Sequence, residues 1–168
     1  TSLTLMGLFV FSSCNLDLTP EDTLSPKTYF KNGPQLELWA NHFYSLLPDA
    51  DDLAKQNADD NISSELGETL MGQRSAASED GWNWDRLRDI NYYLQHSNQC
   101  SDENARKHYD GVAYFFRAYF YFEKVKRYGD VPWYDQVLNS NEDKLLAKPR
   151  QDRELIMDSV MKDLDRAI

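Results

Sequence analysis

One stretch, residues 101–132, constrains the fold of this chain more than any other. Ser101 can cap the first turn of a helix, and the two acidic residues after it suit the positive end of the helix dipole. Basic residues followed by Gly129 and Pro132 are typical of a helix end. Residues 114–122 are aromatic or apolar around much of the helix girth. The stretch therefore predicts a central helix that is packed on more than one side.

Three further segments show helical spacing of apolar residues. Pro34 opens the first and Pro48 ends it. The second begins near Trp84, and Asp152 can cap the last. A stretch from Asp49 to Asp80 has no period, and long loops of this kind are often functional, so we expect it to contribute to ligand contact. No segment alternates with period two, so the prediction is an all-α fold. The inward residues expected are Leu36, Trp39, Ala40, Phe43, Leu46 and Leu47 in the first helix; Trp84, Leu87, Ile90, Asn91 and Leu94 in the second; and Leu155, Ile156, Val160, Leu164, Ala167 and Ile168 in the last.

Length and charge narrow the class of protein. The 168 residues fit one domain, since domains commonly have about 100–200 residues. There are 28 acidic against 18 basic residues, a net charge of -10, and no cluster of Lys and Arg. Nucleic acid is therefore not an expected partner. Because the chain begins at Thr1 and ends at Ile168 inside an apolar helical pattern, we expect a piece of a longer protein that is incomplete at both ends.

The N-terminus resembles an export signal. Residues 3–11 are almost wholly apolar, too few for the ~20 residues that cross a membrane but the size of a signal-peptide core. Small residues and then Cys14 follow, as in a bacterial lipobox, where the cysteine is acylated and anchors the protein to a membrane. The alternative is a buried strand with an incidental cysteine. We expect residues 1–13 to be the rest of a signal peptide, residues 14–32 a lipid-anchored tether with a short helix ending at Phe30, and residues 33–168 the helical domain.

The motifs in this order resemble the SusD/RagB family of outer-membrane nutrient-binding lipoproteins. Residues 117–133 read Arg-Ala-Tyr-Phe-Tyr-Phe-Glu-Lys-Val-Lys-Arg-Tyr-Gly-Asp-Val-Pro-Trp, like the family's aromatic helix and its Gly-Asp-Val-Pro turn. The family's next element, an Arg and then an acidic helix ending in Asp-Leu-x-x-Ala, is similar to residues 150–167. Cys14, the Leu-Asp-x-x-Pro tether at residues 16–20, and the Tyr-Phe pair at residues 29–30 complete the resemblance.

This resemblance implies a fold and a function. The fold would be tetratricopeptide-like helix pairs, the N-terminal part of a protein about three times this length. The function would be that of an outer-membrane, lipid-anchored, surface-exposed protein that binds a glycan without catalysis. By the same resemblance, it would deliver this nutrient to a TonB-dependent, SusC-like outer-membrane transporter.

A candidate sugar site lies where the aperiodic stretch meets the second helical segment. Pyranose rings stack on exposed aromatic rings, while amide and guanidinium groups bond the hydroxyls. Trp84 has the phase of a core residue, which leaves Trp82 as the expected platform, with Asn83 and Arg74 as polar partners. The alternative is that both tryptophans are packed in the interior.

The sequence indicates neither a cofactor nor a metal. No nucleophile elbow, zinc-protease motif or phosphate loop occurs, and the three histidines lack the spacing of metal ligands: His42, His96 and His108. Two rival functions stay open at this stage. One is a helical-repeat scaffold for protein–protein interaction, and the other is an all-α glycosidase or lyase whose carboxylate pair only the fold would bring together.

Overall fold

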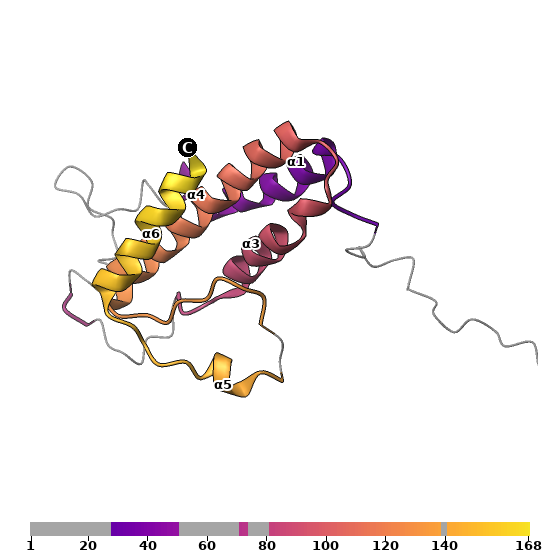
Figure 1. The fold of residues 1–168 in the computed structure, drawn as a ribbon. Helices are drawn as coiled ribbons and strands as arrows, with labels where there is room; N and C mark the ends of the chain where they lie inside the picture. Colours follow the sequence, from indigo (N-terminus) through magenta and orange to yellow (C-terminus); the bar gives the residue numbers. More distant parts are fainter. Residues whose placement is uncertain (1–27, 51–70, 74–80, 139–140) are drawn as a thin grey trace, which may run out of the picture.

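The computed structural model describes residues 28–50, 71–73, 81–138 and 141–168. Within these ranges the regular structure is helical apart from one isolated bridge between Val131 and Gln151. The predicted all-α class is confirmed. Figure 1 shows helices α1, α3, α4 and α6 gathered in a bundle, with the single turn of α5 lying apart from it.

The long helix α4 (Glu103–Tyr128) is the centre of the bundle, as predicted. It contacts α1, α3 and α6. Its N-cap is Asp102, whose carboxylate accepts the Ala105 N–H at 3.0 Å. The prediction that Ser101 caps this helix is wrong by one residue. The Ser101 hydroxyl instead donates to the Lys31 carbonyl at 3.3 Å and ties the helix start to the preceding chain.

Helix α4 ends at the glycine that the sequence indicated. Gly129 has a φ of 70°, in the left-handed region that a residue without a Cβ adopts at little cost. The next residues turn back toward α6, and the Gln151 N–H donates to the Val131 carbonyl at 3.0 Å. This pairing places the chain just before α6 against the turn that follows α4.

Helix α1 (Gly33–Asn41) continues into the 3-10 helix η1 (His42–Leu46), so the predicted segment is confirmed with a tighter last turn. The Asn32 side chain caps α1 by accepting the Gln35 N–H at 3.1 Å. Leu36, Ala40 and Phe43 are buried, as their spacing predicts. Of the same predicted face, Leu47 is 41% exposed, because the chain leaves the helix there in an extended conformation.

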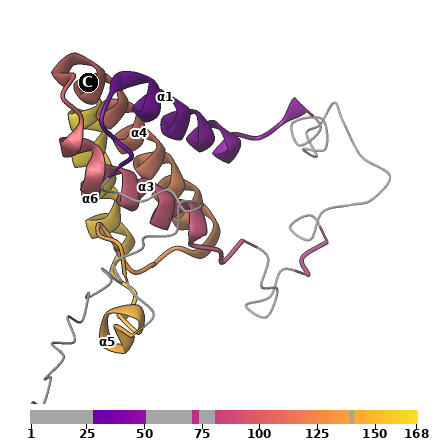
Figure 2. The same ribbon diagram turned by 90° about the vertical axis from the view of Figure 1, so that its right-hand side faces the viewer.

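Helix α3 (Asp85–His96) and the short η2 (Ser97–Gln99) lead into α4. Leu87 and Ile90 are buried on the face that the spacing predicted. Figure 2 shows α3 lying alongside α4 when the molecule is viewed from a second direction.

Helix α5 (Asp143–Leu146) is a single turn, and α6 (Arg153–Ala167) packs along α4 over most of its length. Asp152 caps α6 as predicted, accepting the Glu154 N–H at 2.8 Å. A Cβ built on Gly111 would lie 3.0 Å from the Ala167 carbonyl oxygen, so the end of α6 comes close to the α4 backbone. Leu155, predicted to face inward, is 59% exposed because its neighbour Ile156 takes the inward position.

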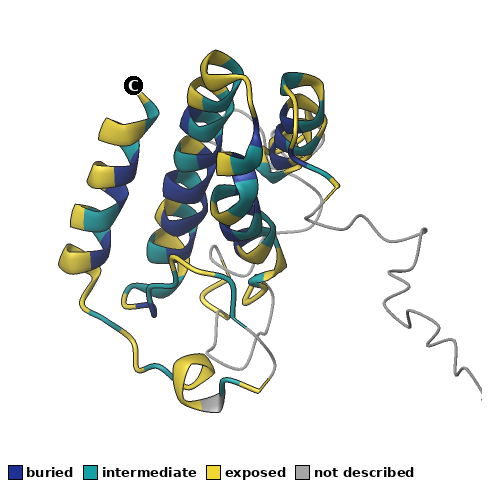
Figure 3. Cartoon of the chain, turned by 45° about the vertical axis from the view of Figure 1, so that its right-hand side comes forward, coloured by how far each residue is buried: buried dark blue, intermediate teal, exposed yellow. Residues whose placement is uncertain are grey.

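In the described part of the chain, the buried side chains form two groups, one toward each end of α4. One joins α1, η1 and α3 to α4, and the other joins α6 and the turn after α4 to the opposite end. Figure 3 shows the buried residues on the inward faces of the helices and exposed residues on the outer face of α6. The first group contains Phe30, Leu36, Ala40, Phe43, Ile90, Tyr93, Cys100, Ala113 and Phe116.

The chain before α1 is fixed by an aromatic anchor. Residues 28–32 form turns and bends, and the rest of the short helix predicted to end at Phe30 lies outside the described residues. Phe30 is 1% exposed, and its ring lies 5.0 Å from that of Trp39 and 5.8 Å from that of His96. The Tyr-Phe pair of the sequence motif thus serves to hold the chain on the bundle.

Candidate functional site

The candidate site is a cavity of about 500 Å³ at the N-terminal end of α3. Its walls come from three segments, residues 82–91, 132–138 and 146–150. Ligand pockets in proteins commonly have ~300–1,000 Å³. The cavity is therefore large enough for a small organic ligand or part of a longer one.

Trp82, the predicted platform, lies at this cavity and is 37% exposed. Its ring is held edge-to-face by two others, with the Tyr128 centroid at 4.7 Å and the Trp84 centroid at 5.2 Å. The Arg150 guanidinium carbon lies 4.9 Å from the Trp82 ring centroid, in the geometry of a cation–π contact. Trp82 thus combines a partly open indole with a cation that lies over it.

The two polar partners predicted for Trp82 have different outcomes. Asn83 does not line this cavity. Its Oδ1 accepts the Asp85 N–H at 2.7 Å and its Nδ2 donates to the Asp85 carboxylate at 3.0 Å, so the side chain caps the start of α3. Arg74 lies outside the described residues. Of the two predicted ligand-binding residues that the structure describes, Trp82 lines the cavity and Asn83 does not.

A buried lysine fixes the backbone on both sides of Trp82. The Lys124 ammonium, on α4, donates to the carbonyl of Gly81 and, at 2.7 Å, to that of Asn83. The same ammonium lies 4.8 Å from the Phe120 ring centroid and 5.4 Å from that of Trp84. Charged hydrogen bonds in a poorly solvated place are strong, so this contact determines where the indole of Trp82 stands.

The charge of Lys124 makes stability depend on pH. Burial lowers the pKa of Lys124 to about 8, and the nearby Arg127 charge acts in the same direction. A lysine in the unfolded chain has a pKa of about 10.4. Between these values the unfolded state binds more protons than the folded state, so the free energy of unfolding increases with pH.

We therefore compare how the free energy of unfolding changes with pH in the wild type and in Lys124→Met. From about pH 8 to about pH 9.5, it should increase by about 1–2 kcal/mol more in the wild type than in the variant. Urea unfolding of both proteins at the two pH values measures this difference. The Lys107→Met variant, which removes an exposed lysine from the same helix, should follow the wild type. If the free energy of unfolding changed equally with pH in the wild type and in Lys124→Met, the lowered pKa of Lys124 would be contradicted.

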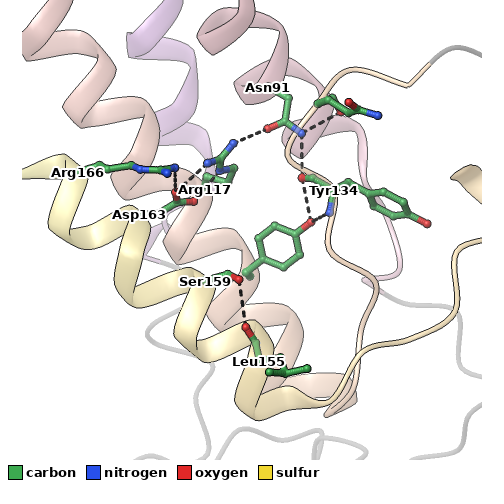
Figure 4. Close-up of polar contacts among 9 residues, drawn as sticks. Asn91, Arg117, Tyr134, Leu155, Ser159, Asp163 and Arg166 are labelled. Atoms are coloured by element: carbon green, nitrogen blue, oxygen red, sulfur yellow. Dashed lines mark hydrogen bonds and ion pairs between the residues drawn. The ribbon is translucent and has the colours of Figure 1, made fainter.

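The opposite wall of the cavity is held through its backbone. The Tyr121 hydroxyl accepts the Tyr134 N–H at 2.6 Å and donates to the Tyr134 carbonyl at 3.1 Å. Asn91 Nδ2 donates to the carbonyls of Tyr134 and Gln136 at 3.0 and 3.2 Å. Figure 4 shows these contacts converging on the segment that carries Tyr134.

The same asparagine connects the wall to a buried ion pair. Arg117 donates from Nε and Nη2 to the two carboxylate oxygens of Asp163, at 2.6 and 2.8 Å, and from Nη1 to Asn91 Oδ1 at 3.2 Å. The side chains of Arg117 and Asp163 are 4% and 1% exposed. Arg166, whose side chain is exposed, contacts the same carboxylate at 3.3 Å (Figure 4). Arg117 begins the aromatic-helix motif on α4, and Asp163 begins the Asp-Leu-x-x-Ala motif on α6. The two motifs thus meet in one bidentate contact.

Sequence reasoning missed the roles of Lys124, Asn91 and Arg150. One signal was available for the first of these. Lys124 follows Phe116 and Phe120 at intervals of four, on the buried stripe of α4, and a charged residue on such a stripe needs a partner. Nothing in the sequence near Lys124 indicated that its partners would be the carbonyls of Gly81 and Asn83.

Neither the histidines nor Cys100 form a metal site in the described part of the chain, where no three His, Cys, Asp or Glu side chains cluster suitably. His42 contacts Arg86 and lies 3.9 Å from Asp89, and His96 Nδ1 donates to the Tyr92 carbonyl at 2.7 Å. Cys100 is a free, buried thiol. Cys14 lies outside the described residues.

None of the described helices has both the length and the apolar composition needed to cross a membrane.

Comparison with known proteins finds a family model and solved structures that match. A SusD-like family model, described as starch-binding associating with outer membrane, matches residues 50–168. The fold is similar to the crystal structure of a SusD-like protein from Bacteroides fragilis, with a TM-score of 0.73 and 23% identity. This match covers 89% of the chain and 32% of the other protein, so the chain spans about a third of that protein's length. No curated protein matches the sequence.

Proposed function

Because the chain belongs to the SusD-like family, we propose that it is part of a lipoprotein at the outer membrane that binds a glycan without catalysing its cleavage. One observation carries the proposal, the cavity where a partly exposed indole, Trp82, stands beside the cationic donors of Lys148 and Arg150. An aromatic face and hydrogen-bond donors are what a sugar ring requires. The family description, starch-binding associating with outer membrane, supports the same ligand class.

Binding is tested by calorimetric titration of the full-length protein with neutral and acidic oligosaccharides. We expect Trp82→Ala to weaken binding of the best ligand about ten- to thirtyfold, as the loss of a central aromatic contact does. Leu38→Ala, which truncates a side chain that is 68% exposed on α1, is the matched control and should bind as the wild type does.

Two results would overturn the proposal. Failure of the full-length protein to bind any oligosaccharide in the panel would remove the glycan function and favour a protein-binding scaffold. Release of reducing ends from the bound oligosaccharide would establish a glycosidase or lyase. Hydrolysis takes a pair of carboxyl groups, and the carboxylate that the described cavity walls contribute, Asp85, accepts a hydrogen bond from Asn83.

The proposal includes the membrane anchor and the partner. Acylated Cys14 would hold the protein at the outer surface, where it passes its ligand to a TonB-dependent transporter. We expect Cys14→Ala to move the protein from the membrane fraction to the soluble periplasmic fraction, because a lipid-anchored protein depends on its acyl chains for attachment. Cys100→Ala is the control, since its thiol is buried in the bundle. Unchanged fractionation of Cys14→Ala would contradict the anchor, and recovery of the transporter with the wild type would support the partnership.

A further inference from the structure

We propose that the cavity takes an oligosaccharide that carries negative charge, as a uronate carboxylate or a sulfate ester. The inference rests on the glycan-binding function proposed above and narrows its ligand to one chemical class. It depends on the charges that the fold gathers around the cavity.

The charge of the cavity is opposite to that of the chain. The whole sequence has a net charge of -10. Three cationic side chains, Arg88, Lys148 and Arg150, line the described cavity walls, against one carboxylate, Asp85. A cleft lined by one sign of charge concentrates its field there and attracts ligands of the opposite sign. A neutral sugar would gain nothing from this distribution.

Each cation keeps donors for a ligand. The Lys148 ammonium makes one hydrogen bond, to the Trp133 carbonyl at 3.1 Å, and has three donors. The Arg150 guanidinium makes one long contact, 3.5 Å to the Asp130 carbonyl, and has five donors. The guanidinium of Arg88 makes neither a hydrogen bond nor an ion pair with any described residue, and the side chain is exposed.

The position of Arg150 suits an anion. Its guanidinium lies over the Trp82 ring, with the carbon 4.9 Å from the ring centroid. An arginine held on an aromatic face is partly desolvated, and its planar fork matches the two oxygens of a carboxylate or sulfate. The pairing of Val131 with Gln151 fixes the backbone next to Arg150, so the fork is presented from an ordered segment.

Asp85 does not cancel these charges. Its carboxylate accepts a hydrogen bond from Asn83 Nδ2 at 3.0 Å, and it stands in the first turn of α3, where the helix dipole favours a negative group. The negative charge of Asp85 therefore serves the helix start. Arg88, one turn further along α3, carries its positive charge into the cavity wall.

The inference is tested by titrating the full-length protein with three tetrasaccharides: tetragalacturonate, a sulfated carrageenan tetrasaccharide and neutral maltotetraose. We expect at least one charged ligand to bind about tenfold or more tightly than maltotetraose, with an affinity that falls several-fold between about 0.05 and 0.5 M NaCl. Whichever charged sugar binds more tightly distinguishes carboxylate from sulfate. Arg88→Gln should weaken binding of that sugar about tenfold, because it removes a charged hydrogen-bond donor from the anionic group.

Lys107→Gln is the matched control. It removes the same unit of charge from an exposed position on α4 that lies outside the cavity, and it should leave the affinity within about twofold. Equal, salt-independent binding of maltotetraose and the charged sugars would overturn the anionic class while leaving the glycan function standing. Binding of none of the three would count against the glycan function itself. If Arg88→Gln and Lys107→Gln lost the same affinity for the charged sugar, the effect would depend on the net charge of the protein alone. That result would overturn the role of the cavity.

Discussion

Replacing Arg117 by alanine should lower the free energy of unfolding by about 3–5 kcal/mol, because it leaves the Asp163 carboxylate buried without its bidentate partner. Both side chains are almost fully buried, and the contacts of 2.6 and 2.8 Å leave no room for a water molecule between the guanidinium and the carboxylate. The change also removes the Nη1 bond to Asn91. Urea unfolding followed by circular dichroism measures the loss.

Two further variants show whether the loss comes from the buried pair. Arg166→Ala removes a second arginine from the same carboxylate, but Arg166 is 58% exposed, so we expect less than about 1 kcal/mol. The double variant Arg117→Met with Asp163→Leu should recover most of the stability, because apolar residues of similar volume often replace a buried ion pair at little cost. An Arg117→Ala protein as stable as Arg166→Ala would contradict this account.

Phe116→Ala should lower the free energy of unfolding by about 3–5 kcal/mol, the range for removing a large side chain from a well-packed interior. Phe116 is 1% exposed, and its ring centroid lies 4.9 Å from that of Tyr44 and 6.2 Å from that of Phe43. These contacts join η1 to α4. The cavity left by the ring would therefore loosen the attachment of α1 and η1 to the bundle.

The matched control is Phe122→Ala, on the same helix. Phe122 is 43% exposed and contacts the Lys126 ammonium at 5.2 Å, so its loss should cost less than about 1 kcal/mol. Thermal unfolding of both variants gives a direct comparison. Similar melting temperatures for Phe116→Ala and Phe122→Ala would show that the interior around η1 is less tightly packed than these distances indicate.

The helices could be predicted because their signals are local. Pro34, Asp152 and Gly129 act within one or two turns of their own positions, and the spacing of apolar residues is a property of each helix by itself. The same local argument gave Ser101 as the cap of α4, although Asp102 is the residue that serves. A carboxylate and a hydroxyl stand next to each other there, and sequence alone does not decide which one the backbone turns toward Ala105.

The site was less predictable because its contacts cross between distant segments. Trp82 could be identified as the tryptophan out of phase with α3, and it does line the cavity. Arg150 lies over the Trp82 ring, and Lys124 bonds the backbone next to Trp82. Long stretches of chain separate both residues from Trp82, so no spacing rule connects them. Asn83 was assigned to a ligand although its position two residues before Asp85 is typical of a local cap.

The way in which the cavity wall is held has a consequence for how such a protein can change. Tyr121 and Asn91 bond the backbone of residues 134 and 136, so these hydrogen bonds make no demand on which side chains the segment carries. The Tyr134 ring packs on Trp84 and its hydroxyl donates to the Leu146 carbonyl at 3.0 Å, but substitutions at Gln136 and Leu138 could alter the shape and chemistry of the wall while the main chain keeps its course. Ligand preference can diverge here independently of folding, which makes these two positions the natural ones to randomise in a library selected for new specificity.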